Sequence, residues 1–215
     1  MEQQRSTNLR SVDAGDKLIE AGVFSYPEAL NALAEFRKNV QEKCREALRA
    51  HLSNLSLAIG KSFSAKDVFV YPDDPVGAGL STYEPWLCAY VTLAAAEEVY
   101  FDLGLFWDYE KGSEFTLCAI GTLEIWKKDF HARAAEWFEA RPELGIKRDP
   151  GKNTCFSLVD PIPKDDPLSF QEKLHGIATK WVDVWGKVGG LAGLLPEAAN
   201  TKRQKNAGTR RDSQR

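Results

Sequence analysis

The stretch from residue 99 to 126, VYFDLGLFWDYEKGSEFTLCAIGTLEIW, constrains the fold more than any other part of the chain. Two runs of alternating residues flank a polar segment that contains Lys111 and Gly112. Period-two alternation is the pattern of β-strands, and a polar segment with glycine between two such runs indicates a hairpin. If Trp107 faces Phe115, one face of this hairpin is wholly apolar. That face comprises Val99, Phe101, Leu103, Leu105, Trp107, Phe115, Leu117, Ala119, Leu123 and Ile125.

The other face of the hairpin carries carboxylates. In the same register Asp102 faces Ile120, and Glu98 faces Glu124. Like charges opposite one another in a sheet are unfavourable, so a metal ion, a basic partner or water must offset the repulsion. With Mg²⁺ bound, Glu98, Asp102 and Glu124 would form a site that activates water for phosphodiester cleavage. A solvated sheet edge is the alternative that requires no chemistry.

Three helices are expected around the strands. Ser25-Tyr26-Pro27-Glu28 has the form of a capping box, which predicts a long helix from Ser25 to about Ala58. A second helix is expected over residues 127–141, and a third begins after Asp166-Pro167 and ends at Gly189-Gly190. The apolar stripe of the third helix comprises Phe170, Leu174, Ile177, Trp181, Trp185 and Val188.

Further strands are expected at 67–71, at 86–93, and in a short hairpin over 145–148 and 154–159. The run at 86–93 is apolar at every second position in both phases, which is typical of a strand buried on both faces. The sequence therefore predicts an α+β fold: a mostly antiparallel sheet of about four to six strands with a long N-terminal helix, a middle helix and a C-terminal helix. We expect a flexible segment at 1–15, a single domain at 16–199 and a basic tail at 200–215.

Two short motifs suggest a family. Pro72-Asp73 ends one predicted strand, and Glu124-Ile125-Trp126-Lys127 ends another. With the order helix, strands, helix, strand over roughly residues 27–160, they resemble the core of the PD-(D/E)xK nuclease superfamily. The resemblance implies a Mg²⁺-dependent nuclease or an inactive relative of one. The motif here is E-x-x-K, so Lys127 points to the face opposite Glu124 and Trp126 takes the place of the lysine.

The charge of the chain is unevenly distributed. The formal net charge is −3, but the tail from residue 200 has six basic residues and one acid, so the tail carries +5 and the rest −8. A basic tail on an acidic body indicates sequence-independent nucleic-acid contact or a solubilising end. The basic residues expected to make such a contact are Lys147, Arg148, Lys152, Lys202, Arg203, Lys205, Arg210 and Arg211.

Tryptophan, cysteine and histidine residues give weaker indications. Trp181 and Trp185 lie one turn apart on the last helix and are either core residues or anchors for a protein partner. The four cysteines stand apart among apolar neighbours, which favours reduced core thiols in the cytosol over disulfides. The three histidines form no ligand pair along the sequence, so we expect no zinc site.

No catalytic pattern outweighs these structural explanations. We therefore predict a non-enzymatic cytoplasmic interaction protein, such as an adaptor, an inhibitor or an accessory subunit, with no cofactor. Its partner is expected to be another protein, with auxiliary nucleic-acid contact through the tail. No membrane contact is expected, because no apolar run approaches the ~18 residues of a membrane span. The alternative is a metal-dependent nuclease, or a degenerate nuclease-like domain, that uses Mg²⁺.

Overall fold

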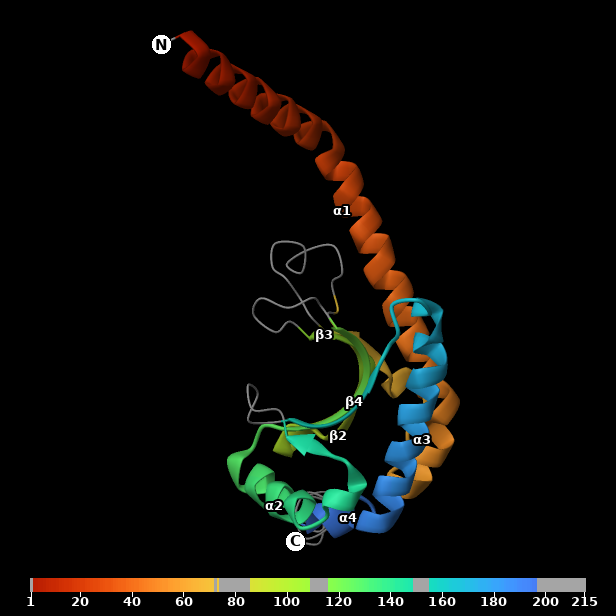
Figure 1. Ribbon diagram of the computed structural model, residues 1–215. Coiled ribbons are helices and arrows are strands. Elements are labelled where there is room, and N and C mark those ends of the chain that lie inside the picture. Colours follow the sequence, from red (N-terminus) through yellow and green to blue (C-terminus); the bar gives the residue numbers. More distant parts are fainter. Residues whose placement is uncertain (1, 72, 74–85, 109–115, 149–154, 197–215) are drawn as a thin grey trace, which may run out of the picture. The chain divides into compact units, whose positions relative to one another are not determined.

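The computed structural model describes residues 2–71, 73, 86–108, 116–148 and 155–196 (Figure 1). Six strands form one antiparallel sheet in the order β1-β2-β3-β4-β6-β5. The chain therefore has the α+β fold that the sequence predicts. The strands are β1 (Phe69–Tyr71), β2 (Trp86–Ala94), β3 (Val99–Asp108), β4 (Thr116–Ile125), β5 (Lys147–Arg148) and β6 (Cys155–Pro161).

The helices are α1 (Glu2–Ile59), α2 (Lys128–Glu139), α3 (Phe170–Val188) and α4 (Gly190–Leu194). The middle and C-terminal helices agree with the prediction, and Gly189 ends α3 in the left-handed region at φ 79°. Among the described residues, no helix has both the length and the apolar character required to cross a membrane.

The start predicted for the first helix is wrong. Helix α1 begins at Glu2, so the capping-box residues Ser25 and Glu28 lie inside it, and residues 2–15 are helical. Each residue added to an existing helix gains a hydrogen bond, so a helix continues through residues that do not interrupt it. Pro27 removes one backbone hydrogen bond without ending this helix.

Contacts within the chain define two compact units. One contains Met1–Asn39 with Asp74–Tyr83, and the other contains Val40–Asp73 with Glu84–Arg215. The sheet, helices α2 to α4 and the second part of α1 all belong to the second unit. The candidate functional site lies entirely within that unit.

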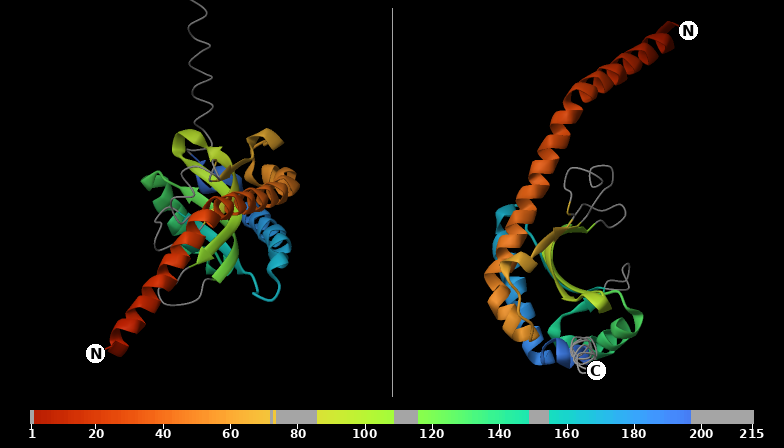
Figure 2. Two further views of the ribbon diagram at one scale, coloured as in Figure 1. Left: turned by 90° about the horizontal axis from the view of Figure 1, so that it is seen from above. Right: turned by 180° about the vertical axis from the view of Figure 1, so that it is seen from behind.

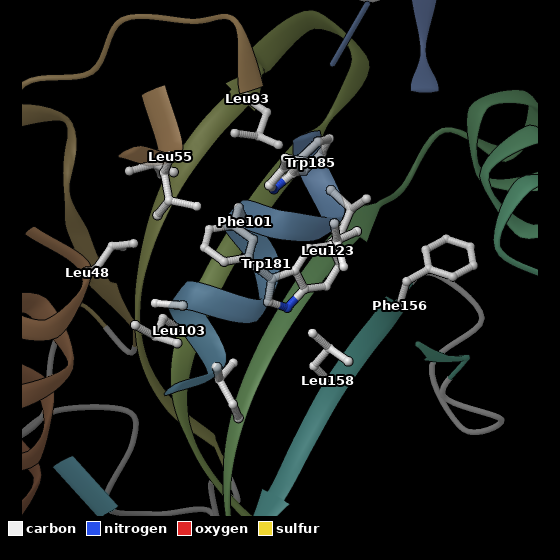
Figure 3. Packing of buried hydrophobic residues seen from close by; sticks show 14 of the residues in the cluster. Leu48, Leu55, Leu93, Phe101, Leu103, Leu123, Phe156, Leu158, Trp181 and Trp185 are labelled. Atoms are coloured by element: carbon white, nitrogen blue, oxygen red, sulfur yellow. The ribbon is translucent and has the colours of Figure 1, made fainter. Parts of the chain in front are cut away.

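The hydrophobic core lies on one face of the sheet, called here the helix face. Figures 1 and 2 show that this sheet is curved, with α3 and the second part of α1 side by side on its convex side. Trp181 of α3 is fully buried and its ring lies 5.4 Å from that of Phe101. Figure 3 shows both indoles of α3 among the leucines that line this core. The labelled core residues are Leu48, Leu55, Leu93, Phe101, Leu103, Leu123, Phe156, Leu158, Trp181 and Trp185.

The predicted faces of the central hairpin are confirmed, but its register is not. Asp102 pairs with Thr122 rather than Ile120, and Tyr100 rather than Glu98 pairs with Glu124. Strand β3 ends at Asp108 and β4 begins at Thr116, so the seven residues between them are 109–115 instead of the expected 108–114, and the register is shifted by two residues. A shift by two leaves every side chain on its predicted face.

The first predicted strand is shorter than expected. Ser64 and Asp67 form a capping box in which the Ser64 amide donates to Asp67 Oδ2 at 2.7 Å. This cap stabilises a 3₁₀ turn over Ala65–Asp67, so β1 begins only at Phe69. The predicted short hairpin is present, since Lys147 pairs with Ser157 and Arg148 with Phe156.

Candidate functional site

The sheet has a second face, opposite the helix face, and this face carries most of its polar side chains. Cross-strand pairing places Phe69, Tyr90, Asp102, Thr122, Ser157 and Lys147 in one row across all six strands. A neighbouring row contains Thr92, Tyr100, Glu124 and Cys155. At the other end of this face, Trp86, Cys88 and Ile120 form a small apolar cluster against Phe106. We call this surface the second face.

Two of the three predicted carboxylates lie on the second face. Asp102 stands between Tyr90 and Thr122 and is only 5% exposed. Glu124 lies diagonally from it and is half-buried. The Thr122 and Ser157 hydroxyls lie 3.1 Å apart and continue the polar row toward β6.

The third predicted carboxylate, Glu98, does not join this pair. It is exposed and has φ 53°, in the left-handed region, where it ends the 3₁₀ turn Ala95–Glu97. Its carbonyl oxygen accepts from the Trp126 amide at 3.2 Å. The predicted cluster of three carboxylates is therefore not formed, because Glu98 precedes β3 instead of belonging to it. No group of three potential ligands that could hold a metal occurs among the described residues.

Glu124 already accepts hydrogen bonds from two neighbouring side chains. The Cys155 thiol donates to Oε1 at 3.4 Å, and the Trp126 indole donates to Oε2 at 3.2 Å. Lys127, the lysine of the E-x-x-K pattern, lies just before α2, where its Nζ is 4.9 Å from the centre of the Phe130 ring. Phe130 belongs to the hydrophobic core, so Lys127 contacts a core ring.

Aromatic rings from three strands meet on the second face beside Asp102. The rings of Phe69 and Tyr90 are 5.5 Å apart, and those of Tyr90 and Tyr100 are 6.2 Å apart and nearly perpendicular. Phe69 is 49% exposed, while the two tyrosines are half-buried. We call these three residues the aromatic row. The sequence alone does not reveal this row, because Phe69 and Tyr90 meet only through the β1–β2 register.

The electrostatic environment of the aromatic row is acidic. Burial raises the pKa of Tyr90, and the carboxylates of Asp102 and Asp73 raise it further. Asp73, from the Pro72-Asp73 motif, therefore lies near Tyr90. At the described positions that these pairings assign to the second face on β1 to β4, there is no lysine or arginine. This part of the face is thus aromatic and negatively charged.

The cysteines near the site are core thiols. All four are free and buried. Burial raises the pKa of Cys44 to about 12, and burial and then the Asp102 charge hold that of Cys88 well above its usual range. A thiol with so high a pKa is a poor nucleophile at neutral pH, so these two cysteines do not provide the chemistry of a nucleophilic site.

A half-open cavity of about 1310 Å³ lies between the end of α1, the end of β2 and the α3–α4 junction. Phe69 of the aromatic row borders it, together with Leu57, Glu97 and Gly190. Lys61 also lines it, and its Nζ donates to the carbonyl oxygens of Thr92 and Leu93, each at 2.6 Å. The lysine therefore binds the two carbonyl oxygens at the end of β2 and fixes this part of the cavity wall.

The remaining predicted site residues lie elsewhere. Trp181 and Trp185 are 0% exposed and fill the core, so the exposed indoles that an interface role requires are not present. Lys147 and Arg148 are exposed on β5, where Arg148 Nη1 lies 3.7 Å from Glu139 Oε1. Lys152, Lys202, Arg203, Lys205, Arg210 and Arg211 lie outside the described residues.

The fold and the second face together define an α+β protein with a six-stranded antiparallel sheet, helices on one face and a polar, aromatic surface on the other. Comparison with protein-family models, with curated proteins and with solved structures found no match for this chain.

Proposed function

We propose that this chain is a non-enzymatic cytoplasmic interaction protein, which binds a cationic segment of another protein on the second face of its sheet. The observation that supports this proposal is the aromatic row beside Asp102. Rings of Phe69, Tyr90 and Tyr100 contact one another from three different strands, next to a carboxylate. The partner residue would be a lysine or an arginine, and the chain would serve as an adaptor, an inhibitor or an accessory subunit.

The chemistry of the aromatic row favours a cation over other ligands. An ammonium or guanidinium group over an aromatic ring gains ~0.5–2 kcal/mol, with the larger value for desolvated sites. Asp102 and Asp73 add negative potential at Tyr90, and the described second-face positions of β1 to β4 contain no lysine or arginine. An anionic ligand such as a nucleic-acid phosphate would be repelled at the same place.

The row is also accessible. Phe69 is 49% exposed and Tyr71, two residues further along the edge strand β1, is 46% exposed. Both pair with residues of the second face, so their rings lie at the edge of that face, from which a partner's side chain can approach Tyr90. Tyrosine is one of the residue types enriched in binding hot spots, because it combines a large apolar surface with a polar tip.

A titration with small model cations tests this proposal. Phenylalanine and tyrosine rings are labelled for NMR, and the full chain is titrated with tetramethylammonium and with the amide of N-acetyl-arginine. We expect saturable shifts of Phe69, Tyr90 and Tyr100, and at least a severalfold weaker response in Phe69→Leu and in Tyr100→Leu. Tyr26→Leu is the matched control, because Tyr26 is 62% exposed but lies on α1.

Neutral and anionic probes decide the outcome. Acetate should leave the three ring signals in place at the same concentrations, and so should a neutral isostere of tetramethylammonium. Equal shifts with the neutral isostere would show that the row is merely an apolar patch. Unchanged titrations in Phe69→Leu and Tyr100→Leu would place cation binding elsewhere and contradict the proposal.

The metal-dependent nuclease alternative has no comparable observation in its favour, because Glu98 precedes β3, no group of three potential ligands occurs among the described residues, and Lys127 contacts the Phe130 ring. Incubation of the purified chain with Mg²⁺ or Mn²⁺ and with single- and double-stranded DNA and RNA tests it. We expect no cleavage. Cleavage that is lost in both Asp102→Asn and Glu124→Gln, while Phe69→Leu retains it, would instead establish the nuclease.

A further inference from the structure

Two histidines that are far apart in the sequence meet between α1 and α3. His51 Nε2 and His175 Nδ1 are 3.0 Å apart, and the ring centres are 5.2 Å apart at an interplanar angle of 49°. His51 is half-buried, while His175 is exposed. Neither ring has another side-chain partner among the described residues. The spacing of histidines along the sequence gave no sign of this pair.

The two facing nitrogens can share only one proton. When both rings are neutral, one ring donates through its N–H and the other accepts through its lone pair. A transition-metal ion can replace that proton, because imidazole nitrogen is a ligand that Zn²⁺, Ni²⁺ and Cu²⁺ favour. With Zn–N bonds of about 2.0–2.1 Å and a tetrahedral angle, the two nitrogens would be roughly 3.3–3.4 Å apart. Small rotations of the rings from the 3.0 Å separation would suffice.

The helices hold both rings in place for such an ion. Leu48 and Leu52, on either side of His51 in α1, are 0% and 7% exposed, and Leu174 next to His175 is 0% exposed. Each ring therefore stands on a helix whose neighbouring side chains are fixed in the core. The Thr179 hydroxyl bonds to the His175 carbonyl oxygen at 2.9 Å and leaves the ring nitrogens free of competition. Because His175 is exposed, water can complete the coordination sphere.

From this juxtaposition we infer that His51 and His175 form a two-histidine site for a divalent transition metal, which fastens α1 to α3. The site takes the imidazole-preferring ions Cu²⁺, Ni²⁺ and Zn²⁺ and excludes hard cations such as Mg²⁺, because both protein ligands are nitrogen. This site is separate from the second face and does not depend on the function proposed for it.

Thermal unfolding and calorimetry of the full chain without an affinity tag test the inference. ZnCl₂, NiCl₂ and CuCl₂ should each raise the Tm in a saturable manner, and MgCl₂ should not. Loss of one of two direct ligands should weaken binding by roughly tenfold or more, the range seen when outer-shell partners of a metal site are removed. We therefore expect at least that loss in His51→Gln and in His175→Gln. Lys180→Gln, an exposed change on α3 that keeps both rings, should bind as the wild type does.

A measurement on the wild type guards against variants that fail to fold. Substoichiometric Ni²⁺ or Cu²⁺ should broaden the ring signals of His51 and His175 selectively and leave those of His131, which is stacked on Phe156, intact. Equal broadening of all three histidines would overturn the inference. So would a Tm shift of the same size in the double variant His51→Gln/His175→Gln, or the lack of any shift with all three ions. The pair would then be only a shared-proton contact between two helices.

Discussion

The indole of Trp181 donates a hydrogen bond to the carbonyl oxygen of Gly121 at 2.9 Å, so helix α3 is joined to the middle of strand β4. A side chain at Gly121 would not fit, because a Cβ there would lie 2.7 Å from Trp181 Cδ1 and 2.6 Å from Ile177 Cγ2. The glycine thus allows the helix to approach the sheet closely enough for a buried indole N–H to find an acceptor.

Gly121→Ala should therefore destabilise the protein by ~1–3 kcal/mol, the usual range for overpacking a well-packed core. Gly176→Ala, on α3, is the matched control, because a Cβ there meets nothing within 4 Å. That change should raise stability by ~0.5–1 kcal/mol, since alanine is favoured over glycine inside helices. Urea unfolding at constant pH measures both. Equal stability of Gly121→Ala and the wild type would mean that β4 and α3 can move apart at no cost.

Phe101→Ala should lower the free energy of unfolding by ~3–5 kcal/mol, because Phe101 is 0% exposed and packs against Trp181. Trp107 lies on the same face but is only half-buried, so Trp107→Ala should cost less. Thermal and urea unfolding of both variants check the order. A larger loss for Trp107→Ala would contradict the arrangement of the core along β3.

Stability should fall as the pH is lowered below neutrality. Burial, and for His51 the neighbouring His175, lower the pKa of His51, while burial and then Arg148 lower that of His131. The unfolded chain therefore binds more protons than the folded one below about pH 6.5, so the stability present above that pH is lost as the pH falls. Each additional proton contributes a slope of at most about 1.4 kcal/mol per pH unit. Unfolding measured from pH 7.5 to 4.5 should show this fall, and His51→Gln should reduce it.

Deletion of residues 200–215 should abolish any sequence-independent binding of the chain to nucleic acid, because these residues carry +5. Binding by the full chain should weaken with salt, with a log–log slope near −0.9 for each phosphate neutralised on duplex DNA. Fluorescence anisotropy on a random duplex at two salt concentrations compares the two proteins, and their melting temperatures should agree. Equal affinities would identify the tail as a solubilising end.

Periodicity was sufficient to predict most elements of the second compact unit, which contains the sheet and is called here the sheet unit. The alternating pattern placed Phe101 and Leu123 on the core face, and the stripe of α3 placed Trp181 toward the sheet, because burial of apolar surface dominates both choices. The hairpin register was not predicted because it depends on which residue lies at the centre of the turn, and alternation does not determine that position. A shift of two residues keeps each face but changes every partner, including that of Asp102.

The candidate site was less accessible to sequence analysis for a related reason. Asp102 and Glu124 were placed on the correct face, but Glu98 was not, because its φ of 53° interrupts the alternation just before β3. The contacts between Phe69 and Tyr90, and between His51 and His175, join residues of different elements. No local pattern of residue types records such contacts, since they follow from the packing of the whole sheet unit.

The two outermost strands of the sheet bear on how the protein behaves at high concentration. β1 has three residues and β5 only two, and both side chains of β5 are charged and exposed. Pairing of sheet edges between molecules requires long, flat strands with unpaired backbone groups, and charged side chains oppose it. A second molecule would therefore find few backbone hydrogen bonds to make at either outermost strand, and the longest strands, β3 and β4, are paired on both sides within the sheet. In this way the arrangement of strand lengths protects a sheet rich in valine, leucine and phenylalanine against edge-to-edge aggregation.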